Sequence, residues 1–582
     1  MPVGMAPTFC NRCGDAVVGE GCDPWDELDE LDALSDRLRL KRYDLKRNIN
    51  RFHSPIAPTF CNHCRDAVEH ECDPWNELAE LDALSERLRL KRYNLKGKIN
   101  RFHSPIIRQL PPDVTLTIFK FCLPDLTSLT GDNHLSSYTE EDLSIPLSLG
   151  AICSYWRDIA WSTPSLWSSL VVRFRRKHDA HIITSIAQEW LARSGQLPLS
   201  IRIFSLDYHE AISALAFIIN QYSTLWSDLD LDIPVFYYRR FHATDNHAPI
   251  LKSIRLRNSD FGMMMMHMNF QLTCPRLERA CLTYLPMYGI NIQWDNLTHL
   301  TLHSMSIVDS FAILRKTPRL VFCKVTGFSG SHIIVSMIGE PVLTSMRSLQ
   351  LLSPSFTKSF FNNLIAPHLE EFSLSRYYNL STIDSEMLEV ITSFLRRSTC
   401  SLRSFSMIFS HIFPPYIASF MSLLQSMPSL NTLSIISTTT TTWYSEITTP
   451  EDYDPQNIFQ LVAKVLSSQS TSLQGFLPNL KVLEYTGRLD LRPKILDGLC
   501  CLLPPNNAVH GPLHLLRLDL HPATRIPITL ISYFSCLVER GVAVNVLSKS
   551  EDILQSSIDY HMFREGSLCW DWADNLDSNL FS

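Results

Sequence analysis

The chain has 582 residues, which at roughly 150 residues per domain allows up to about four folding units. Its composition is 45% hydrophobic and 19% charged, which excludes a chain that is disordered throughout or collagen-like. The 52 Lys and Arg residues against 59 Asp and Glu residues give a net charge of -7. No global basic field therefore attracts nucleic acid or anionic membranes.

Signatures of enzymatic sites are missing from the sequence. The 19 glycines are under half the usual share of about 7%, and none of the glycine-rich signatures of dinucleotide, P-loop or kinase sites is present. No HExxH or EF-hand motif occurs, and Gly327-Phe328-Ser329-Gly330 misses the nucleophile elbow by one position. We therefore expect a protein without catalytic residues.

The sequence contains no targeting or membrane segment that we recognise. Residues 1–18 include Asn11, Arg12 and Asp15 where a secretory signal needs an apolar core. No run of about 18 apolar residues could cross a membrane. We therefore expect a cytoplasmic or nuclear protein with no membrane partner, whose 16 cysteines are reduced.

A tandem duplication opens the chain. Residues 6–56 recur as residues 57–106 with one deletion and a few substitutions, so residues 1–56 and 57–106 are expected as two copies of a cysteine cluster followed by a helix. In the second copy the helix is predicted to begin at Asp73-Pro74 and to end at His103-Ser104-Pro105.

Each predicted helix carries a heptad seam with a 3-4-3-4 spacing. The seam positions are Leu28, Leu31, Ser35, Leu38, Arg42, Leu45, Ile49 and Phe52, repeated as Leu78, Leu81, Ser85, Leu88, Arg92, Leu95, Ile99 and Phe102. About four heptads predict a short coiled coil, although Ser and Arg at two seam positions weaken it. The two helices either pair with each other or pair with another chain.

The cysteine clusters have the spacing of metal sites. Cys10 and Cys13, and likewise Cys61 and Cys64, form C-x-x-C pairs, in which two thiolates can share one tetrahedral metal ion. Only the second copy has histidines nearby, so a zinc site would pool four thiolates from both copies. Inert thiols are the alternative, and a redox pair is less favoured because no βαβ pattern surrounds the cysteines. No other cofactor is expected.

Basic runs lie within both predicted helices, at residues 37–42 and 87–92. Such runs can follow the phosphates of a nucleic acid. The first turns of the helices are acidic and the last turns basic, which complements the helix dipole. We therefore favour a solvated helix face and do not expect nucleic acid as a partner.

Two short helices are predicted within residues 107–172. The first begins at Leu110-Pro111-Pro112-Asp113 and ends at Leu123-Pro124, and the second carries an apolar stripe through residues 149–160. Such short helices cannot bury both of their faces, so we expect an exposed apolar face that binds a partner protein. The expected binding residues are Leu110, Pro111, Val114, Ile118, Phe119, Leu149, Ile152, Cys153, Trp156 and Ile159.

These residues carry a resemblance to a known family. The pattern Leu-Pro-Pro-Asp-(x4)-Ile-Phe-(x2)-Cys-Leu-Pro is followed by Leu-(x2)-Ile-Cys-(x2)-Trp-Arg-(x)-Ile-Ala-(x2)-Thr-Pro-(x)-Leu-Trp. It resembles the F-box, in the F-box-like form common in large mushroom-type fungal families, although the loop near residues 125–144 is longer than usual. The resemblance implies that the partner is a Skp-family adaptor and, through it, a cullin scaffold.

A looser repeat is predicted over residues 193–548. It consists of L-x-x-L-x-L-like cores whose early spacings of about 20 to 28 residues are close to the leucine-rich-repeat period. The cores are Trp226/Leu229/Leu231, Leu251/Ile254/Leu256, Leu277/Ala280/Leu282, Leu297/Leu300/Leu302, Leu320/Cys323/Val325, Met346/Leu349/Leu351, Leu369/Phe372/Leu374, Leu402/Phe405/Met407, Leu430/Leu433/Ile435, Leu480/Leu483/Tyr485 and Leu515/Leu518/Leu520. The series indicates a leucine-rich-repeat solenoid, and residues 549–582 are expected to form an acidic tail.

The sequence thus predicts an α+β multi-domain chain with N-terminal helices in a short coiled coil, a helical F-box and an irregular α/β solenoid. The expected function is that of a non-enzymatic substrate receptor of a Skp-cullin-F-box ubiquitin ligase, with a protein target that the sequence does not identify. The alternative is a zinc-stabilised or nucleic-acid-associated regulatory protein that acts through the duplicated module of cysteines and basic helix.

Overall fold

A computed structural model of the chain describes residues 8–9, 16–17, 24–52, 74–103, 110–124, 144–174, 180–259, 268–328, 340–352, 358–375, 385–409, 417–437, 477–487, 513–520, 526, 528–539, 541–548 and 551–565. The chain divides into two compact units. The first consists of Met1–Ser169 and Glu189–Leu197, and the second of Leu170–Gln188 and Pro198–Ser582.

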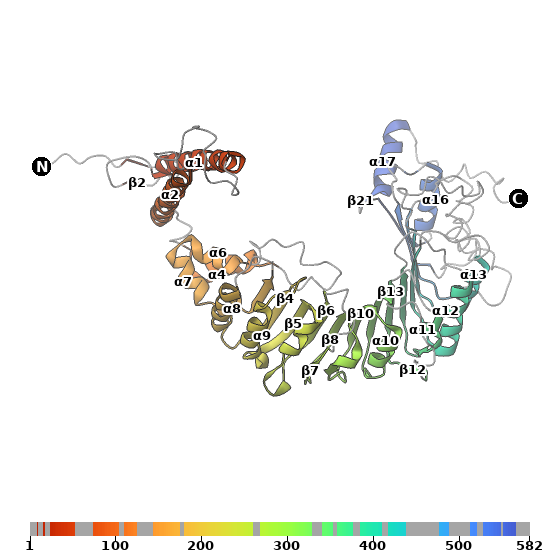
Figure 1. Cartoon of the computed structure of the whole chain (residues 1–582). Helices are drawn as coiled ribbons and strands as arrows, with labels where there is room; N and C mark the ends of the chain where they lie inside the picture. The colour runs from red at the N-terminus through yellow and green to blue at the C-terminus, as the bar shows by residue number, and fades with distance from the viewer. Residues whose placement is uncertain are drawn as a thin grey trace. The chain divides into compact units, whose positions relative to one another are not determined.

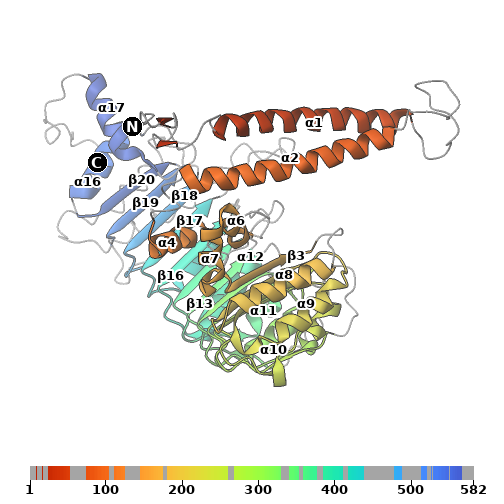
Figure 2. The same ribbon diagram turned by 90° about the vertical axis from the view of Figure 1, so that its left-hand side faces the viewer.

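The first unit begins with two small strands and a pair of long helices. Strands β1 (Thr8–Phe9) and β2 (Ala16–Val17) pair antiparallel. Helices α1 (Pro24–Phe52) and α2 (Pro74–His103) come from the two copies of the duplication, and the bounds of α2 agree with the predicted start and end. The two helices lie side by side and run antiparallel (Figure 2). The copies therefore pair with each other within one chain.

The predicted heptad seam forms the contact between α1 and α2. The buried seam residues are Leu28, Leu31, Leu38, Leu78, Leu81 and Leu95. The seam positions with Ser and Arg are half-buried in both copies. Seam residues Ile49, Phe52, Ile99 and Phe102 have no described side chains. The seam is thus an apolar stripe interrupted by polar residues at matching places in the two helices.

Three short helices follow in the first unit: α4 (Pro112–Cys122), α6 (Ile145–Ile152) and α7 (Ser154–Trp161). Helix α4 has proline at its first position, Asp113 in its first turn and Lys120 in its last, an arrangement that suits the helix dipole. It ends at extended Leu123, as expected for a residue before a proline. The predicted bounds of this helix are confirmed, and the predicted loop over residues 125–143 lies outside the described residues.

The second predicted helix is interrupted, which the apolar stripe over residues 149–160 did not indicate. Cys153 is extended, with φ -157° and ψ 169°, and its Sγ accepts a hydrogen bond from the backbone N–H of Trp156 at 3.4 Å. The Nε of Arg157 donates to the carbonyl of Gly150 at 2.9 Å and so caps the preceding helix. A Cβ at Gly150 would lie 1.8 Å from the ring of Trp161, so only glycine fits this close approach.

A tryptophan cluster completes the first unit after the 3-10 helix η2 (Pro164–Leu166). The fully buried Trp167 packs edge-to-face against Trp161 at 5.2 Å and against Trp190 at 4.8 Å between ring centroids. Its Nε1 donates to the carbonyl of Ala160 at 2.7 Å. The guanidinium of Arg193 lies 5.1 Å from the centroids of both Trp161 and Trp167. Trp190 and Arg193 belong to helix α8 (Ala180–Arg193).

A large sheet dominates the second unit, and fifteen of the described strands belong to it. In chain order they are β3 (Ser169–Arg173), β4 (Leu199–Phe204), β5 (Trp226–Ile233), β6 (Ser253–Asn258), β8 (Arg279–Thr283), β10 (His299–Met305), β11 (Phe322–Phe328), β13 (Ser348–Leu352), β15 (Glu371–Ser375), β16 (Ser404–Phe409), β17 (Thr432–Ser437), β18 (Val482–Gly487), β19 (Leu515–Leu520), β20 (Ala543–Ser548) and β21 (Glu551–Asp552). Their order in the sheet is their order in the chain (Figure 1).

The sheet is parallel from β4 to β20, and β21 pairs antiparallel with β20. Two further parallel pairs, β7 (Phe270–Leu272) with β9 (Ile290–Ile292) and β12 (Val342–Leu343) with β14 (Leu364–Ile365), lie outside it. Of the predicted α+β chain with an irregular α/β solenoid, the mixture of helices and strands is confirmed, and the described strands form a large, mostly parallel sheet. The sheet begins at Ser169, upstream of the predicted start of the repeats at residue 193.

The predicted cores occupy equivalent places in successive strands. Leu300 pairs with Cys323, and Leu302 pairs with Val325, so each core aligns with the core of the next strand. The last predicted core is wrong by two residues, because Leu483 pairs with Leu516 and not with Leu518. The equivalent core there is Leu513/Leu516/Leu518, and all three of its side chains are buried.

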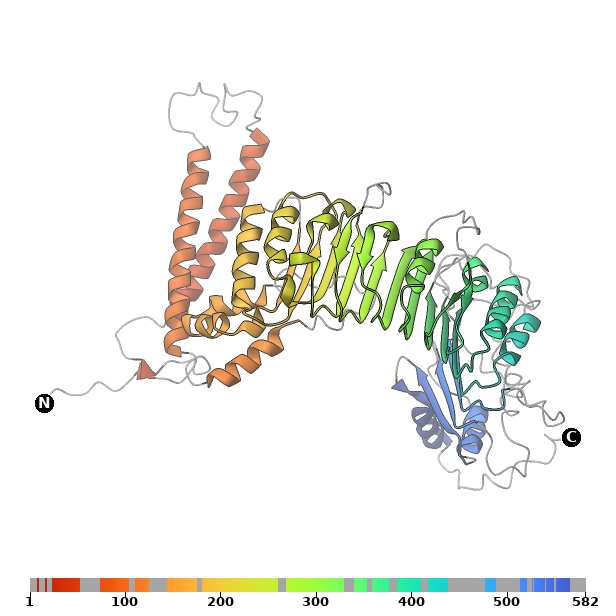
Figure 3. The ribbon, with the colours of Figure 1, turned by 90° about the horizontal axis from the view of Figure 1, so that it is seen from below.

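Connecting helices cover the face of the sheet on which these cores lie (Figures 1 and 3). The helices of this unit, beside α8, are α9 (Ala211–Asn220), α10 (Ile307–Leu314), α11 (Lys358–Asn362), α12 (Ser385–Ser398), α13 (Ile417–Gln425), α16 (Ile528–Glu539) and α17 (Ile553–Glu565). The 3-10 turns are η3 (Ser223–Leu225), η4 (Val235–Arg240), η5 (Thr244–Asn246) and η6 (Met287–Gly289). Phe372 of β15 contacts Phe361 of α11 and Phe394 of α12, with ring centroids 6.3 and 6.4 Å away.

The predicted acidic tail over residues 549–582 is wrong in its first part. Residues 551–565 form β21 and α17, and α17 packs against β20. Ser557 is buried, and its hydroxyl accepts a hydrogen bond from the backbone N–H of Ile526 at 3.0 Å. The apolar Ile553 is also buried, which outweighs the polar composition of this segment. Residues 566–582 lie outside the described residues.

Candidate functional site

Helix α4 carries an exposed apolar strip. Val114, Ile118 and Phe121 are four and three residues apart, so their side chains lie on one side of the helix. Val114 is 43% exposed, Ile118 is half-buried and Phe121 is 86% exposed. An exposed phenylalanine on an ordered helix leaves a large apolar surface in water, as partner-binding surfaces do. We call Val114, Ile118 and Phe121 the α4 strip.

The other side of α4 holds the strip in place. Thr115 and Phe119 are fully buried, and Phe119 packs edge-to-face against Trp156 of α7 with ring centroids 4.9 Å apart. The Oγ1 of Thr115 donates to the carbonyl of Pro111 at 3.2 Å. The strip therefore sits on a helix whose rotation is fixed by an aromatic contact and not by solvent-exposed side chains.

The structure separates the residues that were predicted to bind a partner into three groups. Pro111, Val114 and Ile152 are exposed, while Leu110, Ile118, Cys153, Trp156 and Ile159 are half-buried. Phe119 and Leu149 are buried. These two face inward and cannot be surface contacts, so their inclusion was wrong. They shape the surface by supporting the helices from below.

Phe121 was missed by the sequence analysis, although its position carried the signal. It stands three residues after Ile118 and seven after Val114, which is the spacing of one helix face. The neighbouring Phe119 fits the same stripe less well but was chosen. Periodicity identified an apolar stripe and could not tell which of its edges was covered by α7.

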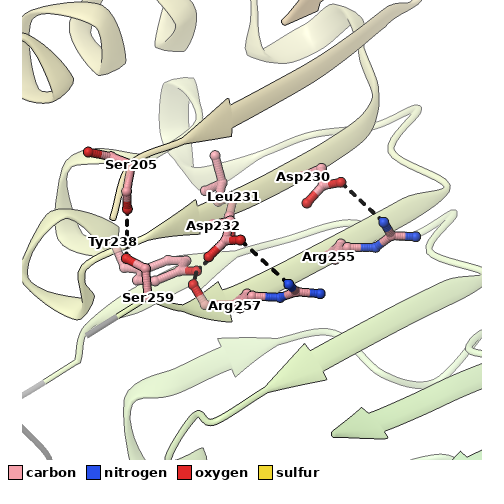
Figure 4. Close-up of polar contacts among 8 residues, drawn as sticks. All are labelled: Ser205, Asp230, Leu231, Asp232, Tyr238, Arg255, Arg257 and Ser259. Carbon is pink, nitrogen blue, oxygen red and sulfur yellow. Dashed lines mark hydrogen bonds and ion pairs between the residues drawn. The ribbon is translucent and has the colours of Figure 1, made fainter. Parts of the chain in front are cut away.

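A second candidate site is a polar, largely buried cluster on strands β5 and β6, whose charged side chains lie on the face of the sheet opposite the buried cores. Asp230 of β5 faces Arg255 of β6 at 3.4 Å, and Asp232 faces Arg257 at 3.7 Å (Figure 4). These pairs follow the strand register, in which Asp230 is opposite Arg255 and Asp232 is opposite Arg257. The hydroxyl of Tyr238 lies within hydrogen-bond distance of the carbonyls of Leu231 and Arg257.

Burial shifts the protonation of both aspartates. Each is only 8% exposed, and the Oδ1 of each accepts no hydrogen bond. Burial raises the pKa of Asp230, although Arg255 and Arg202 oppose the shift. Burial and the charge of Asp230 raise the pKa of Asp232 to about 6, against the opposing charge of Arg257. Taking a carboxylate out of water costs more here than the nearby arginines return.

The raised pKa predicts how stability depends on pH. The folded chain binds the Asp232 proton more tightly than the unfolded chain, so this group stabilises the fold below about pH 4. That stabilisation is lost as the pH rises through about 6. We expect Asp232→Asn to reduce the fall in the free energy of unfolding between pH 4 and pH 7 by about 2 kcal/mol. Urea unfolding of the full chain at several pH values measures this.

The matched control for that measurement is Asp228→Asn. Asp228 lies on the same strand and the same face of the sheet, but it is less buried and its Oδ2 accepts a hydrogen bond from the Oγ of Ser227. This variant should keep the pH profile of the wild type. If the free energy of unfolding depended on pH in the same way in the wild type and in Asp232→Asn, ionisation of Asp232 would not destabilise the fold, and the prediction would be wrong.

An aromatic patch lies where strands β4 and β5 end. Leu206 and Tyr208 follow β4 and are exposed. Phe236 and Tyr237 follow β5, and their rings lie 6.4 and 6.0 Å from the ring of Tyr208. The exposed Arg239 places its guanidinium 4.2 Å from the centroid of Phe236. Tyrosine, phenylalanine and arginine are the residue types that dominate protein-protein contacts.

The basic runs of α1 and α2 are occupied by ion pairs. Lys41 and Arg42 of α1 pair with acidic residues of α2, and Lys91 and Arg92 of α2 pair with acidic residues of α1. These charges are therefore neutralised inside the module, which leaves less of the runs for a phosphate backbone. The ion pairs therefore disfavour the nucleic-acid alternative.

The cysteine pairs Cys10/Cys13 and Cys61/Cys64 lie outside the described residues, so the zinc site stays a prediction. In the part of the chain that the structure describes, no group of three or more His, Cys, Asp or Glu residues is placed to hold a metal ion. In the second unit, burial raises the pKa values of Cys274, which precedes β8, and of Cys323 in β11 to about 12. These two thiols therefore stay protonated and pack as small apolar groups.

Comparisons with known proteins give little for this chain. No family model and no curated protein matches its sequence. Among solved structures, the crystal structure of a protein from Bacteroides fragilis is similar at 11% identity and a TM-score of 0.25, over 47% of this chain and 67% of that chain. A similarity of this extent carries no argument about fold or function. Among the described residues, no helix has the length and apolar character needed to cross a membrane.

Proposed function

We propose that the protein is a non-enzymatic substrate receptor of a Skp-cullin-F-box ubiquitin ligase. In this proposal helices α4, α6 and α7 form an F-box-like domain that binds a Skp-family adaptor. The parallel sheet with its connecting helices is a leucine-rich-repeat solenoid that binds a protein target. The complex would act in the cytoplasm or the nucleus.

The α4 strip is the observation that carries this proposal. It places two exposed apolar side chains, Val114 and Phe121, on a helix that is fixed from behind by Phe119 and Trp156. When a partner covers such a surface, apolar area leaves water and the free energy of the complex is lowered. It also lies within the segment whose sequence resembles the F-box, so the resemblance names the partner.

The mechanism would be positional. Binding the adaptor and the target at the same time raises the effective concentration of the target near the ubiquitin-conjugating enzyme. The protein would supply binding energy and orientation and no acid, base or nucleophile. The aromatic patch of Leu206, Tyr208, Phe236, Tyr237 and Arg239 is the surface we expect the target to use, because the exposed Leu206 and Tyr208 lie beside an exposed arginine that stacks on Phe236.

Adaptor binding tests the proposal directly. We expect the full chain to bind a purified Skp-family adaptor with a Kd of about 1 μM or tighter, measured by calorimetry. Val114→Asp or Phe121→Asp should weaken binding by about a hundredfold, because a carboxylate must then be buried against an apolar partner. Trp156 is a poor target for mutation, because its loss would disturb the packing of Phe119.

Phe217→Asp is the matched control. Phe217 lies on α9 in the second unit and is 70% exposed, so the change in charge and apolar surface is similar. Binding should be unchanged in this variant, and circular dichroism of each variant should match the wild type. A correctly folded wild-type chain that does not bind the adaptor would contradict the proposal.

A further inference from the structure

The contacts between α1 and α2 occur twice. Lys41 of α1 pairs with Glu77 of α2 at 3.0 Å, and Lys91 of α2 pairs with Glu27 of α1 at 3.0 Å. The duplication aligns each residue of α1 with the residue 50 positions later in α2, as Leu28 aligns with Leu78. The second pair is therefore the first pair with the two helices exchanged.

Two arginine–aspartate ion pairs are related in the same way, by exchange of the two helices. Arg42 binds Asp82, and the equivalent Arg92 binds Asp32, with Nε to Oδ1 distances of 2.5 Å in both pairs. In each pair the arginine Nη2 also donates a hydrogen bond to the Oδ2 of the same carboxylate, at 3.2 and 3.1 Å. These bidentate contacts also explain the arginine at a seam position in each helix, since its side chain reaches across to the other copy.

The apolar part of the contact follows the same symmetry at two of its equivalent positions, while Leu45 is less buried than its equivalent Leu95. Leu28 and Leu31 of α1 form one buried cluster with Leu95 of α2, and Leu88 packs against it. The equivalent Leu78 and Leu81 are buried as well. An interface in which each contact recurs with the partners exchanged is self-complementary, which is the property of a two-fold dimer interface.

We propose that the helix of this module is a homotypic docking element, and that its partner is a second antiparallel copy of the same helix. In this chain the tandem copy is that partner, so the element is closed within one molecule. A chain with one free copy would bind the free copy of another chain through the same surface. This inference is independent of the proposed receptor function.

The charges select the antiparallel arrangement. Both acidic partners, Glu27 and Asp32, lie in the first half of α1, and both basic partners, Lys41 and Arg42, lie in the second half. Two such helices in parallel would place like charges side by side, which opposes pairing. Antiparallel pairing brings each acidic half against a basic half, in one chain or between two chains.

Charge reversal in α1 of the full chain tests the proposal. The variant Glu27→Lys, Asp32→Arg, Lys41→Glu and Arg42→Asp turns all four attractive contacts with α2 into repulsive ones. It keeps the contacts complementary between the α1 helices of two chains, and α2 remains complementary to a second α2. We expect the wild type to be monomeric and this variant to form dimers or larger assemblies at about 50 μM.

The size of the effect decides whether this exchange is observable. Pairing within one chain has an effective concentration of about 1 mM, so α1–α2 pairing must weaken by more than about twentyfold before pairing between chains at about 50 μM can compete with it. Each exposed ion pair contributes only a few-fold. When all four pairs change from attraction to repulsion, α1–α2 pairing should weaken by about a hundredfold or more at low salt. Light scattering after size-exclusion chromatography at low ionic strength measures the mass.

The control reverses the charges in both helices. Adding Glu77→Lys, Asp82→Arg, Lys91→Glu and Arg92→Asp makes α1 and α2 complementary again, so this eight-site variant should return to the monomer. A wild-type chain that self-associates through α1 and α2 would overturn the proposal, and so would an α1 variant that stays monomeric. An eight-site variant that assembles like the four-site variant would also overturn it, because the number of changes and not the pairing would then cause association.

Discussion

Replacing Trp167 with alanine should destabilise the helical part of the first unit by about 3–5 kcal/mol, the cost of removing a fully buried tryptophan. The ring contacts Trp161 and Trp190, and its indole N–H donates to the carbonyl of Ala160. The variant loses these contacts together and leaves the carbonyl of Ala160, at the end of α7, without this donor. Helices α6 and α7 should therefore open far more often.

Hydrogen exchange of the full chain measures this loss locally, which suits a protein with two units. A cost of 3–5 kcal/mol corresponds to at least about a hundredfold faster exchange of the α6 and α7 amides. Phe217→Ala removes an exposed aromatic ring instead and should change exchange by less than about threefold. Equal protection in Trp167→Ala and wild type would show that the tryptophan cluster does not hold these helices.

The repeat cores were predictable from the sequence because apolar and polar residues alternate along each strand. This alternation determines which side chains face the core. In Leu297/Leu300/Leu302 the residues before and between the leucines are polar, so only one set of side chains can turn inward. The observed register then pairs each core with the next, as Leu349 with Phe372. Local pattern and long-range pairing agree over most of the sheet.

The last core shows where this reasoning fails. Leu513, Leu515, Leu516, Leu518 and Leu520 fit the repeat in two overlapping frames. The composition of the segment does not choose between them, and the choice is made by pairing with β18, where Leu483 meets Leu516. When pairing with a neighbouring strand decides which residues form the core, the sequence of the strand alone does not predict them.

The candidate surface was predictable in location and not in detail. The stripe on α4 was identified, but the burial of Phe119 depends on Trp156, which lies 37 positions further along the chain and across a helix interruption. The interruption itself was hidden, because Leu149, Ile152 and Trp156 keep a helical spacing through the extended Cys153. Periodicity reports which residues are apolar and does not report the path of the backbone between them.

The charged groups were the least predictable part. The sequence showed arginine at two seam positions as a weakness of the coiled coil, whereas the structure shows Arg42 and Arg92 bound to Asp82 and Asp32 of the other copy. The buried Asp230 carried no signal in the sequence that set it apart from a surface aspartate. Both depend on which charges the fold brings opposite each other, and that information lies in the tertiary contacts.

The largest effect in the second unit is expected from Phe372→Ala. Phe372 is 1% exposed and contacts Phe361, Phe394 and Phe405, the last with ring centroids 5.7 Å apart. Alanine would leave a cavity shared by α11, α12 and the neighbouring strand β16, and should cost about 3–5 kcal/mol. Because β15 pairs only with β13 and β16, we expect the loosening to be centred on these elements.

The adjacent Ser373 provides the control, because successive residues of a strand point to opposite faces of the sheet. Ser373 is half-buried and lies on the face of the sheet opposite Phe372, so Ser373→Ala should change the free energy of unfolding by less than about 0.5 kcal/mol. Hydrogen exchange should show faster opening of β15, α11 and α12 in Phe372→Ala and wild-type protection in Ser373→Ala. Similar effects of the two substitutions would mean that the two faces of β15 have been assigned wrongly, and with them the alternation on which the repeat cores rest.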